Sequence, residues 1–241
     1  MPANPSPGAT MTNSVGMTMV YVPPGEFRMG SDLAEPGRHD DETAHEVKIT
    51  RGFWIAATEV TQPQWEKVMG FNRSDPKGEN LPASRLSWPQ AVEFCRKLSQ
   101  TEKRTYRLPT EAQWEYACRA GSGGACSGGQ LDEVAWHMDN SGEAPHEVAG
   151  KKPNKWGLYD MHGNAAEWCR DFYQRDLGTG LAIDPPGPAE GKARVVRGGS
   201  WGHFARACRS AARASFNPAY PLERVGLRVI IETKAQVSPN P

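Results

Sequence analysis

The sequence predicts a single loop-rich domain in which a few helices and short strands are joined by irregular segments. Eight Trp accompany 25 Gly and 20 Pro in a chain of 241 residues, a composition that favours irregular backbone laid over aromatic anchors. Three segments carry the same helix-starting pattern, and several short runs have the composition of strands. No segment repeats at a fixed period, and no long linker divides the chain. One domain is therefore expected.

The two ends of the chain are expected to lie outside this domain. Residues 1–16 are rich in Pro, Ser, Asn and Gly, and residues 232–241 have a similar composition. Such stretches bury too little apolar surface to offset the entropy lost on ordering. We therefore expect a disordered leader at 1–16, the domain at 17–231 and a disordered tail at 232–241.

Short strands are expected first. Residues 17–23 and 27–30 have strand composition and flank the turn residues Pro24 and Gly25, so they predict a hairpin. Residues 45–50 and 53–56 predict two further strands. Beyond the glycine-rich stretch that begins at Gly121, almost no helical periodicity is seen before Arg194, and loops with short strands are expected there.

Three helices are expected because each begins with a capping box. In each, a hydroxyl side chain can accept a hydrogen bond from the backbone N–H three residues on, while a Gln at that position reaches back to the cap. The pairs are Thr61 with Gln64, Ser87 with Gln90, and Thr110 with Gln113. The second and third helices then place apolar residues at helical spacing, which gives each an apolar face for the core.

The charge balance limits the choice of partners and location. The chain has 28 basic and 28 acidic side chains, so it has no overall attraction to polyanions, and no nucleic acid partner is expected. No apolar run is long enough to cross a bilayer, and the first residues have neither a basic nor an apolar signal-peptide region. We expect no membrane insertion and, by default, a cytoplasmic protein.

Cysteine and acidic residues offer several candidate sites, each with a simpler alternative. The five cysteines are scattered without a CxxC pair, so separate thiols are expected and their pairing stays open. The cluster of acidic and His residues at 39–46 could hold a transition metal, but its spacing matches no helical ligand pair, and a solvated acidic loop is the simpler interpretation.

The segment from Asn154 to Asp171 is a second candidate metal site. Asp160 and Glu167 are hard oxygen donors, and the turn at Gly163 could bring backbone carbonyls to the same point, as in calcium sites built from loops. The alternative is a buried turn whose polar side chains bond local N–H groups. The residue types alone leave both open.

The C-terminal arginines and Cys208 are the remaining candidates. Arginines that recur among small residues could bind an acidic ligand, yet guanidinium groups also tie loops together through carbonyls and carboxylates, and the structural use is favoured. Cys208 and His203 suggest a nucleophile and base, but the segment is irregular and no third group orients them. No phosphate loop, G-x-S-x-G or H-E-x-x-H motif is present.

Five segments together are similar to the formylglycine-generating enzyme, or sulfatase-modifying factor, superfamily. They are residues 23–31 (PPGEFRMGS), 57–61 (ATEVT), 107–116 (RLPTEAQWEY), 157–168 (GLYDMHGNAAEW) and 197–201 (RGGSW). They follow one another in family order over residues 17–231. The resemblance implies an α+β fold, the C-type lectin fold of the formylglycine-generating enzyme type, with few helices and short antiparallel strands.

The resemblance also implies a metal site. The second calcium site of that family is built on the D-x-x-G-N-x-x-E segment, which implies calcium held here by the side chains of Asp160 and Glu167 and the carbonyls of Gly163 and Ala165. Asp160 stands where some members have Asn.

The activity of the family requires residues that this chain does not have. Formylglycine-generating enzymes oxidise a substrate cysteine with oxygen, using a copper ion held by two cysteines after the RGGSW segment. His203 takes the first of these positions here, and Cys208 matches the second only if a shortening of about three residues is ignored. The thiolate pair that suits a soft metal is absent, so copper and this catalysis are not expected.

The C-terminal stretch resembles more closely the variable proteins of diversity-generating retroelements, which display a variable surface on the same fold. The shared frame includes Arg197, Arg209, Arg213 and Arg228, with Leu227 where Phe is usual. The residues between would form the ligand-binding surface. They are Gly202, His203, Phe204, Ala207, Ala212, Ala214, Ser215, Phe216, Asn217, Ala219, Tyr220 and Leu222. All are types reachable from an Asn codon by changing adenines, the mutagenesis that those elements use.

The first hypothesis is therefore a non-catalytic binding protein that presents this surface to a protein or other macromolecular ligand. An oxidoreductase of the same family, with an altered metal site acting on a peptide or thiol substrate, is the first alternative. The second is an accessory or immunity protein that binds an effector. The sequence does not identify the ligand.

Overall fold

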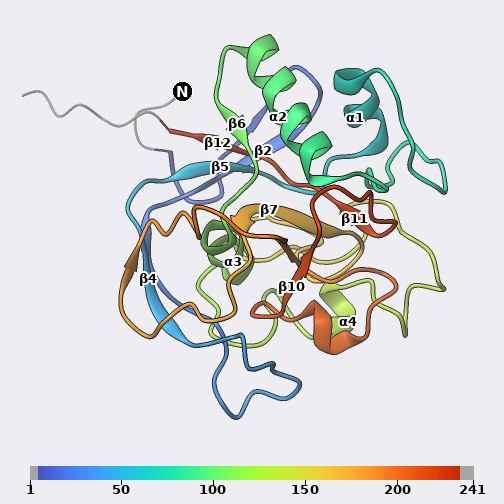
Figure 1. The fold of residues 1–241 in the computed structure, drawn as a ribbon. Helices are drawn as coiled ribbons and strands as arrows, with labels where there is room; N and C mark the ends of the chain where they lie inside the picture. The colour runs from blue at the N-terminus through green and yellow to red at the C-terminus, as the bar shows by residue number, and fades with distance from the viewer. Residues whose placement is uncertain (1–4, 234–241) are drawn as a thin grey trace, which may run out of the picture.

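The structure is a computed structural model, which describes residues 5–233. Its strands form three sheets (Figure 1). The five-stranded sheet has the order β1-β2-β5-β12-β6. Its strands are β1 (Thr10–Thr12), β2 (Thr18–Val22), β5 (Phe53–Ala56), β12 (Ile230–Glu232) and β6 (Tyr106–Arg107). The pairing of β12 with both β5 and β6 places the end of the domain in the middle of this sheet.

The second sheet has four strands in the order β10-β9-β7-β11, and the third has three in the order β3-β4-β8. The strands of the second are β10 (Arg213–Phe216), β9 (Arg194–Arg197), β7 (Ala166–Phe172) and β11 (Val225–Gly226). Those of the third are β3 (Gly25–Met29), β4 (His45–Ile49) and β8 (Ala182–Ile183). The strands are short and the connections long, as the Gly and Pro content predicts.

The three predicted helices are present, and each begins at its capping box. They are α1 (Gln62–Met69), α2 (Trp88–Glu102) and α3 (Glu111–Arg119). In each, the Gln side chain accepts a hydrogen bond from the N–H of the cap residue, at 3.0, 2.8 and 3.1 Å in chain order. At α3 the reciprocal bond from Gln113 N to Thr110 Oγ1 is 3.2 Å long. A further short helix, α4 (Leu131–Val134), and a 3-10 turn at Ala205–Cys208 lie in segments where no helix was expected.

The hydrophobic core has two parts. In one, α1 and α2 pack on the five-stranded sheet through Trp54, Trp65 and Phe94, and the rings of the last two stack 5.3 Å apart. In the other, α3 packs Trp114 against buried residues of β5 and β9 such as Ile55 and Val195. Figure 1 shows α1 and α2 at the upper side of the molecule, and the 3-10 turn, in orange, on the lower side near α4.

Two expectations differ from the structure. The hairpin predicted for residues 17–30 is wrong, because β2 pairs with β1 and β5 whereas β3 pairs with β4 in another sheet. Part of the expected leader is also ordered, because Thr10–Thr12 pairs with β2 as an edge strand. All three prolines that suggested disorder precede Thr10.

At the other end, Glu232 of the expected tail belongs to β12. Residues 1–4 and 234–241, which the leader and tail expectations also cover, lie outside the described residues. Among residues 5–233, no helix is both long and apolar enough to cross a membrane.

Candidate functional site

Arg197 anchors the C-terminal segment from inside the domain. Its buried guanidinium donates to three carbonyl oxygens of the segment, those of Ser210 (2.8 Å), Ala211 (2.9 Å) and Ala212 (2.5 Å). It also donates to the carboxylate of Glu115 on α3. One side chain therefore satisfies three carbonyls of a stretch that is mostly irregular and fixes that stretch to a helix.

Arg209 ties the same segment to the loop before β4. It donates to both carboxylate oxygens of Glu42, at 2.6 and 2.8 Å, and to Glu35 at 2.6 Å. Burial alone would raise the pKa of Glu42, but the hydrogen bonds from Arg209 and Ser31 and the charge of Arg209 hold it below its ordinary value. Glu42 of the acidic cluster at 39–46 is thus the buried ion-pair partner of Arg209. Within residues 5–233, no group of three or more His, Cys, Asp or Glu side chains is arranged to hold a metal ion.

Two further arginines complete the frame. Arg213 makes two hydrogen bonds to Glu111, at 2.6 and 2.9 Å, and one to the carbonyl of Asp41 at 2.7 Å. Arg228, which is fully buried, donates to Glu167 and to the carbonyls of Ala56 and Tyr159. The prediction that these arginines are used structurally is confirmed.

Gly199 is the position in the RGGSW segment where a side chain fits least. Its φ is +70°, which L residues adopt at a cost, and an added Cβ would lie 2.6 Å from Cys208 Sγ. The close contact between this turn and the 3-10 turn fixes the path of the residues that follow Trp201.

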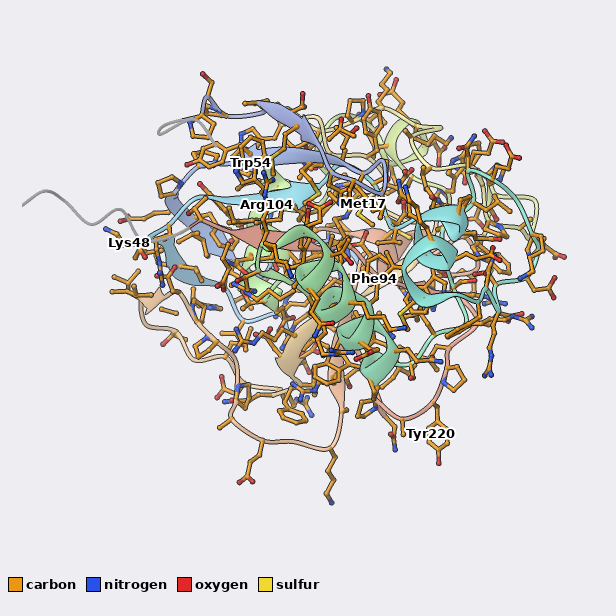
Figure 2. The ribbon with its side chains drawn as sticks, turned by 90° about the horizontal axis from the view of Figure 1, so that it is seen from above. Met17, Lys48, Trp54, Phe94, Arg104 and Tyr220 are labelled. Carbon is orange, nitrogen blue, oxygen red and sulfur yellow. The ribbon has the colours of Figure 1, made fainter. Side chains whose placement is uncertain are left out.

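The predicted variable residues are mostly at the surface. Phe204, Phe216 and Tyr220 expose 53%, 36% and 64% of their area, although they are large and apolar. Figure 2 shows Tyr220 pointing away from the ribbon. Asn217 and Ala219 are also exposed, and five others are partly exposed, namely His203, Ala207, Ala214, Ser215 and Leu222.

Gly202 and Ala212 are buried, so these two of the predicted surface positions are not exposed. Ala212 lies in the turn that Arg197 holds through its carbonyls. Gly202 lies against Arg224, whose guanidinium would be 2.5 Å from an added Cβ. Matching the sequence to the variable-protein frame cannot separate buried from exposed positions, because Gly202 and Ala212 are buried by contacts with residues far away in the sequence.

A small pocket of about 130 Å³ opens among the variable residues. Five of the twelve line it, namely His203, Ala207, Ala212, Ala214 and Phe216. Gly198 and Gly199 of the frame also line it, together with His39, Ala166, Val196 and Arg213. Ala212, although buried, therefore contributes to the pocket. The structure brings together variable residues from His203 to Phe216 and His39 from the loop before β4.

The pair of His203 and Cys208 does not form a nucleophilic site. The Nδ1 atom of His203 lies 2.8 Å from Ser200 Oγ, and the pKa of His203 is lowered by burial and by the charge of Arg224. Cys208 is fully buried, and burial raises the pKa of its thiol to about 12. A buried thiol that stays protonated is a poor nucleophile at neutral pH.

Sequence reasoning missed the loop at 136–146, which borders this surface. Its Met138 N–H donates to the carbonyl of His203 at 3.0 Å, and its Ser141 hydroxyl donates to the carbonyl of Trp201 at 2.8 Å. Trp136 and His146 stack 3.6 Å apart in the same loop. Both links to the surface end on backbone carbonyls, so no residue pattern in the sequence could have indicated them.

The structure places the predicted calcium ligands in one buried segment, and the two carboxylates among them differ in their hydrogen bonding. Both oxygens of Glu167 are taken, by Arg228 and by Trp114 Nε1 at 2.6 Å. Asp160 accepts from Ala149 N through Oδ2, while its Oδ1 is buried without a partner. Glu167 is thus already engaged with Arg228, whereas Asp160 keeps one buried oxygen without a partner; calcium at Asp160, Gly163, Ala165 and Glu167 stays a prediction.

A second carboxylate, which the sequence did not suggest, lies beside Asp160. Glu59 is fully buried, its Oε1 accepts from Ala165 N at 3.1 Å, and its Oε2 has no partner. Burial raises the pKa of Glu59, and the charge of Asp160 raises it further. These two neighbouring carboxylates thus each have one buried oxygen without a hydrogen-bond partner.

Comparisons with known proteins agree with the geometry. The family model of the sulfatase-modifying factor enzyme 1-like domain matches residues 6–233. The formylglycine-generating enzyme of Streptomyces coelicolor is 29% identical over 94% of this chain and 92% of that enzyme.

Two solved structures are similar over nearly their whole length. Treponema denticola variable protein 1 has a TM-score of 0.86 and 31% identity, covering 93% of this chain and 99% of that one. PvdO from Pseudomonas aeruginosa has a TM-score of 0.84 and 26% identity, and the match covers 95% of this chain and 100% of that one. The α+β architecture is thus the C-type lectin fold of the formylglycine-generating enzyme type, and the chain belongs to the sulfatase-modifying factor family.

Proposed function

We propose that this chain is a non-catalytic binding protein that presents a variable surface to a macromolecular ligand, as the variable proteins of diversity-generating retroelements do. The observation that carries the proposal is that the C-terminal segment combines buried anchoring arginines with exposed residues. Arg197, Arg209 and Arg213 are held inside by carboxylates and carbonyls. The exposed variable residues lie between and beyond them, namely Phe204 before Arg209, and Phe216, Asn217, Ala219 and Tyr220 after Arg213. Such a frame lets surface residues change without removing the contacts that hold the fold.

The exposed side chains suit a protein ligand. Phe204, Phe216 and Tyr220 together would bury large apolar areas on binding, and aromatic residues are common among the side chains that dominate protein interfaces. His203 and Asn217 add polar groups to the same surface. The surface carries little net charge of its own, which again favours a protein over nucleic acid.

The similarity to Treponema denticola variable protein 1 supports this proposal, since it extends over 93% of the chain. The family relationship to formylglycine-generating enzymes supports the alternative, an oxidoreductase. At the site itself, however, the position of the first copper cysteine is His203, and Cys208 is buried as a thiol.

The genome around the coding region tests the proposal. We expect a reverse-transcriptase gene and a near-copy of the stretch that encodes residues 201–226, differing from it at adenines of the template. The differences should fall in the codons of the exposed residues and spare those of Arg209 and Arg213. A genome with neither feature would overturn the retroelement assignment.

Oxygen consumption separates the two functions. The purified chain, supplied with copper and a cysteine-containing peptide, should consume no more oxygen than a Cys208→Ser variant or buffer. Turnover that disappears in that variant would show catalysis and contradict the non-catalytic assignment.

A further inference from the structure

A second cavity lies along α2, apart from the predicted variable surface. It has a volume of about 590 Å³, and none of the twelve variable residues lines it. Its wall includes Trp88 and Val92 of α2, and buried Tyr106 and Leu108 line its inner part. Figure 2 looks down on α2, with Arg104 beyond one end of the helix and Tyr220 toward the other.

Part of this apolar wall belongs to the core, since Tyr106 and Leu108 are core residues and Trp88 packs against the core, but Val92 does not. The face of α2 that packs inward carries Ala91, Phe94, Cys95 and Leu98. Val92 lies outside this face and exposes 38% of its area to the cavity and solvent. A cavity of this size falls within the range of roughly 300–1,000 Å³ that holds small-molecule ligands, and such sites are mostly apolar.

The rim of the cavity is basic. Five cationic side chains line it and no acidic one does, although the chain as a whole has equal numbers of both. They are Arg96, Lys103, Arg104, Arg107 and Arg170.

Only two of these cations are neutralised. Arg96 pairs with Glu93 at 2.6 Å, and Arg107 pairs with Glu232. Lys103, Arg104 and Arg170 make no ion pair with any residue between positions 5 and 233. The nearby acid Glu102 instead accepts from Ser14 N and the hydroxyl of Tyr106.

We infer that this cavity binds a small amphipathic anion, with an apolar body against Trp88 and Val92 and a carboxylate or similar head group at Arg104 and Arg170. The apolar wall gains from excluding water, and the unpaired cations attract the charged end, the guanidinium groups being suited to carboxylate geometry. The inference does not depend on the function proposed for the C-terminal surface, because the two sites share no lining residue.

The full chain titrated calorimetrically with dodecanoate tests this inference. We expect saturable binding at one site, tighter than for octanoate, with no competition from acetate at the same concentration. The double variant Arg104→Glu with Arg170→Glu should weaken binding by at least about tenfold. Lys77→Glu with Lys155→Glu, which makes the same charge change at exposed sites away from the cavity, should bind as the unchanged protein does.

The apolar wall is tested separately by Val92→Asp, which should lower the affinity for dodecanoate and remove the preference for the longer chain. Thermal unfolding of every variant checks that it is folded. Absence of saturable binding, equal weakening in both double variants, or equal competition by acetate would overturn the inference. Binding of a DNA duplex that the Arg104→Glu with Arg170→Glu variant loses, with no binding of dodecanoate, would assign the cations to a polyanion and would overturn it as well.

Discussion

Asp171 is a buried acid whose environment favours the protonated form. Burial and the neighbouring charge of Glu111 raise its pKa from 3.8 to about 8, although it accepts a hydrogen bond from Glu111 N at 2.9 Å. A group whose pKa is raised by folding stabilises the native state most at pH values below its unfolded pKa. This contribution is lost as the pH rises from about 4 to about 8.

Asp171→Asn should therefore be more stable than the unchanged protein at pH 8, by up to a few kcal/mol, because the amide keeps the acceptor and has no charge to desolvate. The difference should shrink toward pH 4. Urea unfolding at several pH values measures it. A constant difference across this range would show that Asp171 does not titrate in it.

The neighbouring carboxylates of Asp160 and Glu59 are the two groups at which calcium binding can be tested. Each has one buried oxygen without a partner, so a divalent cation there would relieve the repulsion between them. We expect about 1 mM calcium to raise the melting temperature of the unchanged protein and to leave that of Asp160→Asn with Glu59→Gln unaffected. Magnesium serves as the control cation. If calcium stabilises both proteins alike, or neither, the expectation of a calcium site at this turn is wrong.

At the scale of elements, arginines replace regular hydrogen bonding as the link between segments. The 3-10 turn at Ala205–Cys208 and the strand β10 are joined to α3 and to the loop before β4 mainly through Arg197, Arg209 and Arg213. Long irregular connections have few ladder partners for their carbonyls, and guanidinium groups supply donors instead.

Arg209→Ala should cost about 3–5 kcal/mol in the free energy of unfolding, because it leaves Glu42 buried and unpaired. Arg206→Ala is the matched control: Arg206 is exposed, and its guanidinium lies 5.0 Å from the ring of Phe204, so about 1 kcal/mol or less is expected. Chemical denaturation measures both. Adding Glu42→Gln to Arg209→Ala should recover part of the loss, and failure to do so would show that the cost is not one of unpaired charge.

On the scale of the whole molecule, stability and recognition occupy different parts of one segment. The frame arginines are buried and linked to two of the three sheets and to α3, while the aromatic residues between them are partly to largely exposed. This separation is what a binding protein with a changeable surface requires.

The triple variant Phe204→Ser, Phe216→Ser and Tyr220→Ser should accordingly unfold within about 1.5 kcal/mol of the unchanged protein, since each side chain is at least 36% exposed. Gly199→Ala, a much smaller change, should cost more than about 1 kcal/mol, because its φ is +70° and its Cβ would meet Cys208. Reversed effects in denaturation would contradict the division of the segment into frame and surface.

The sequence by itself determined where α1, α2 and α3 begin, the class of fold and the structural use of the arginines. Helix starts such as the one at Thr110 depend on contacts three residues apart, which any reader of the sequence can locate. The five motifs identified the family, because they follow in family order along nearly the whole domain.

Only the tertiary structure decided which residues meet across long separations. Arg209 and Glu42 are 167 positions apart, and nothing local indicates that the acidic loop at 39–46 is the partner of an arginine and not a metal site. The same holds for β2 and β3, which follow one another but join different sheets, and for Ala212, whose burial is set by the anchoring of its turn to Arg197. Local chemistry fixes turns and caps, but burial and pairing depend on surfaces that come together only when the chain is folded.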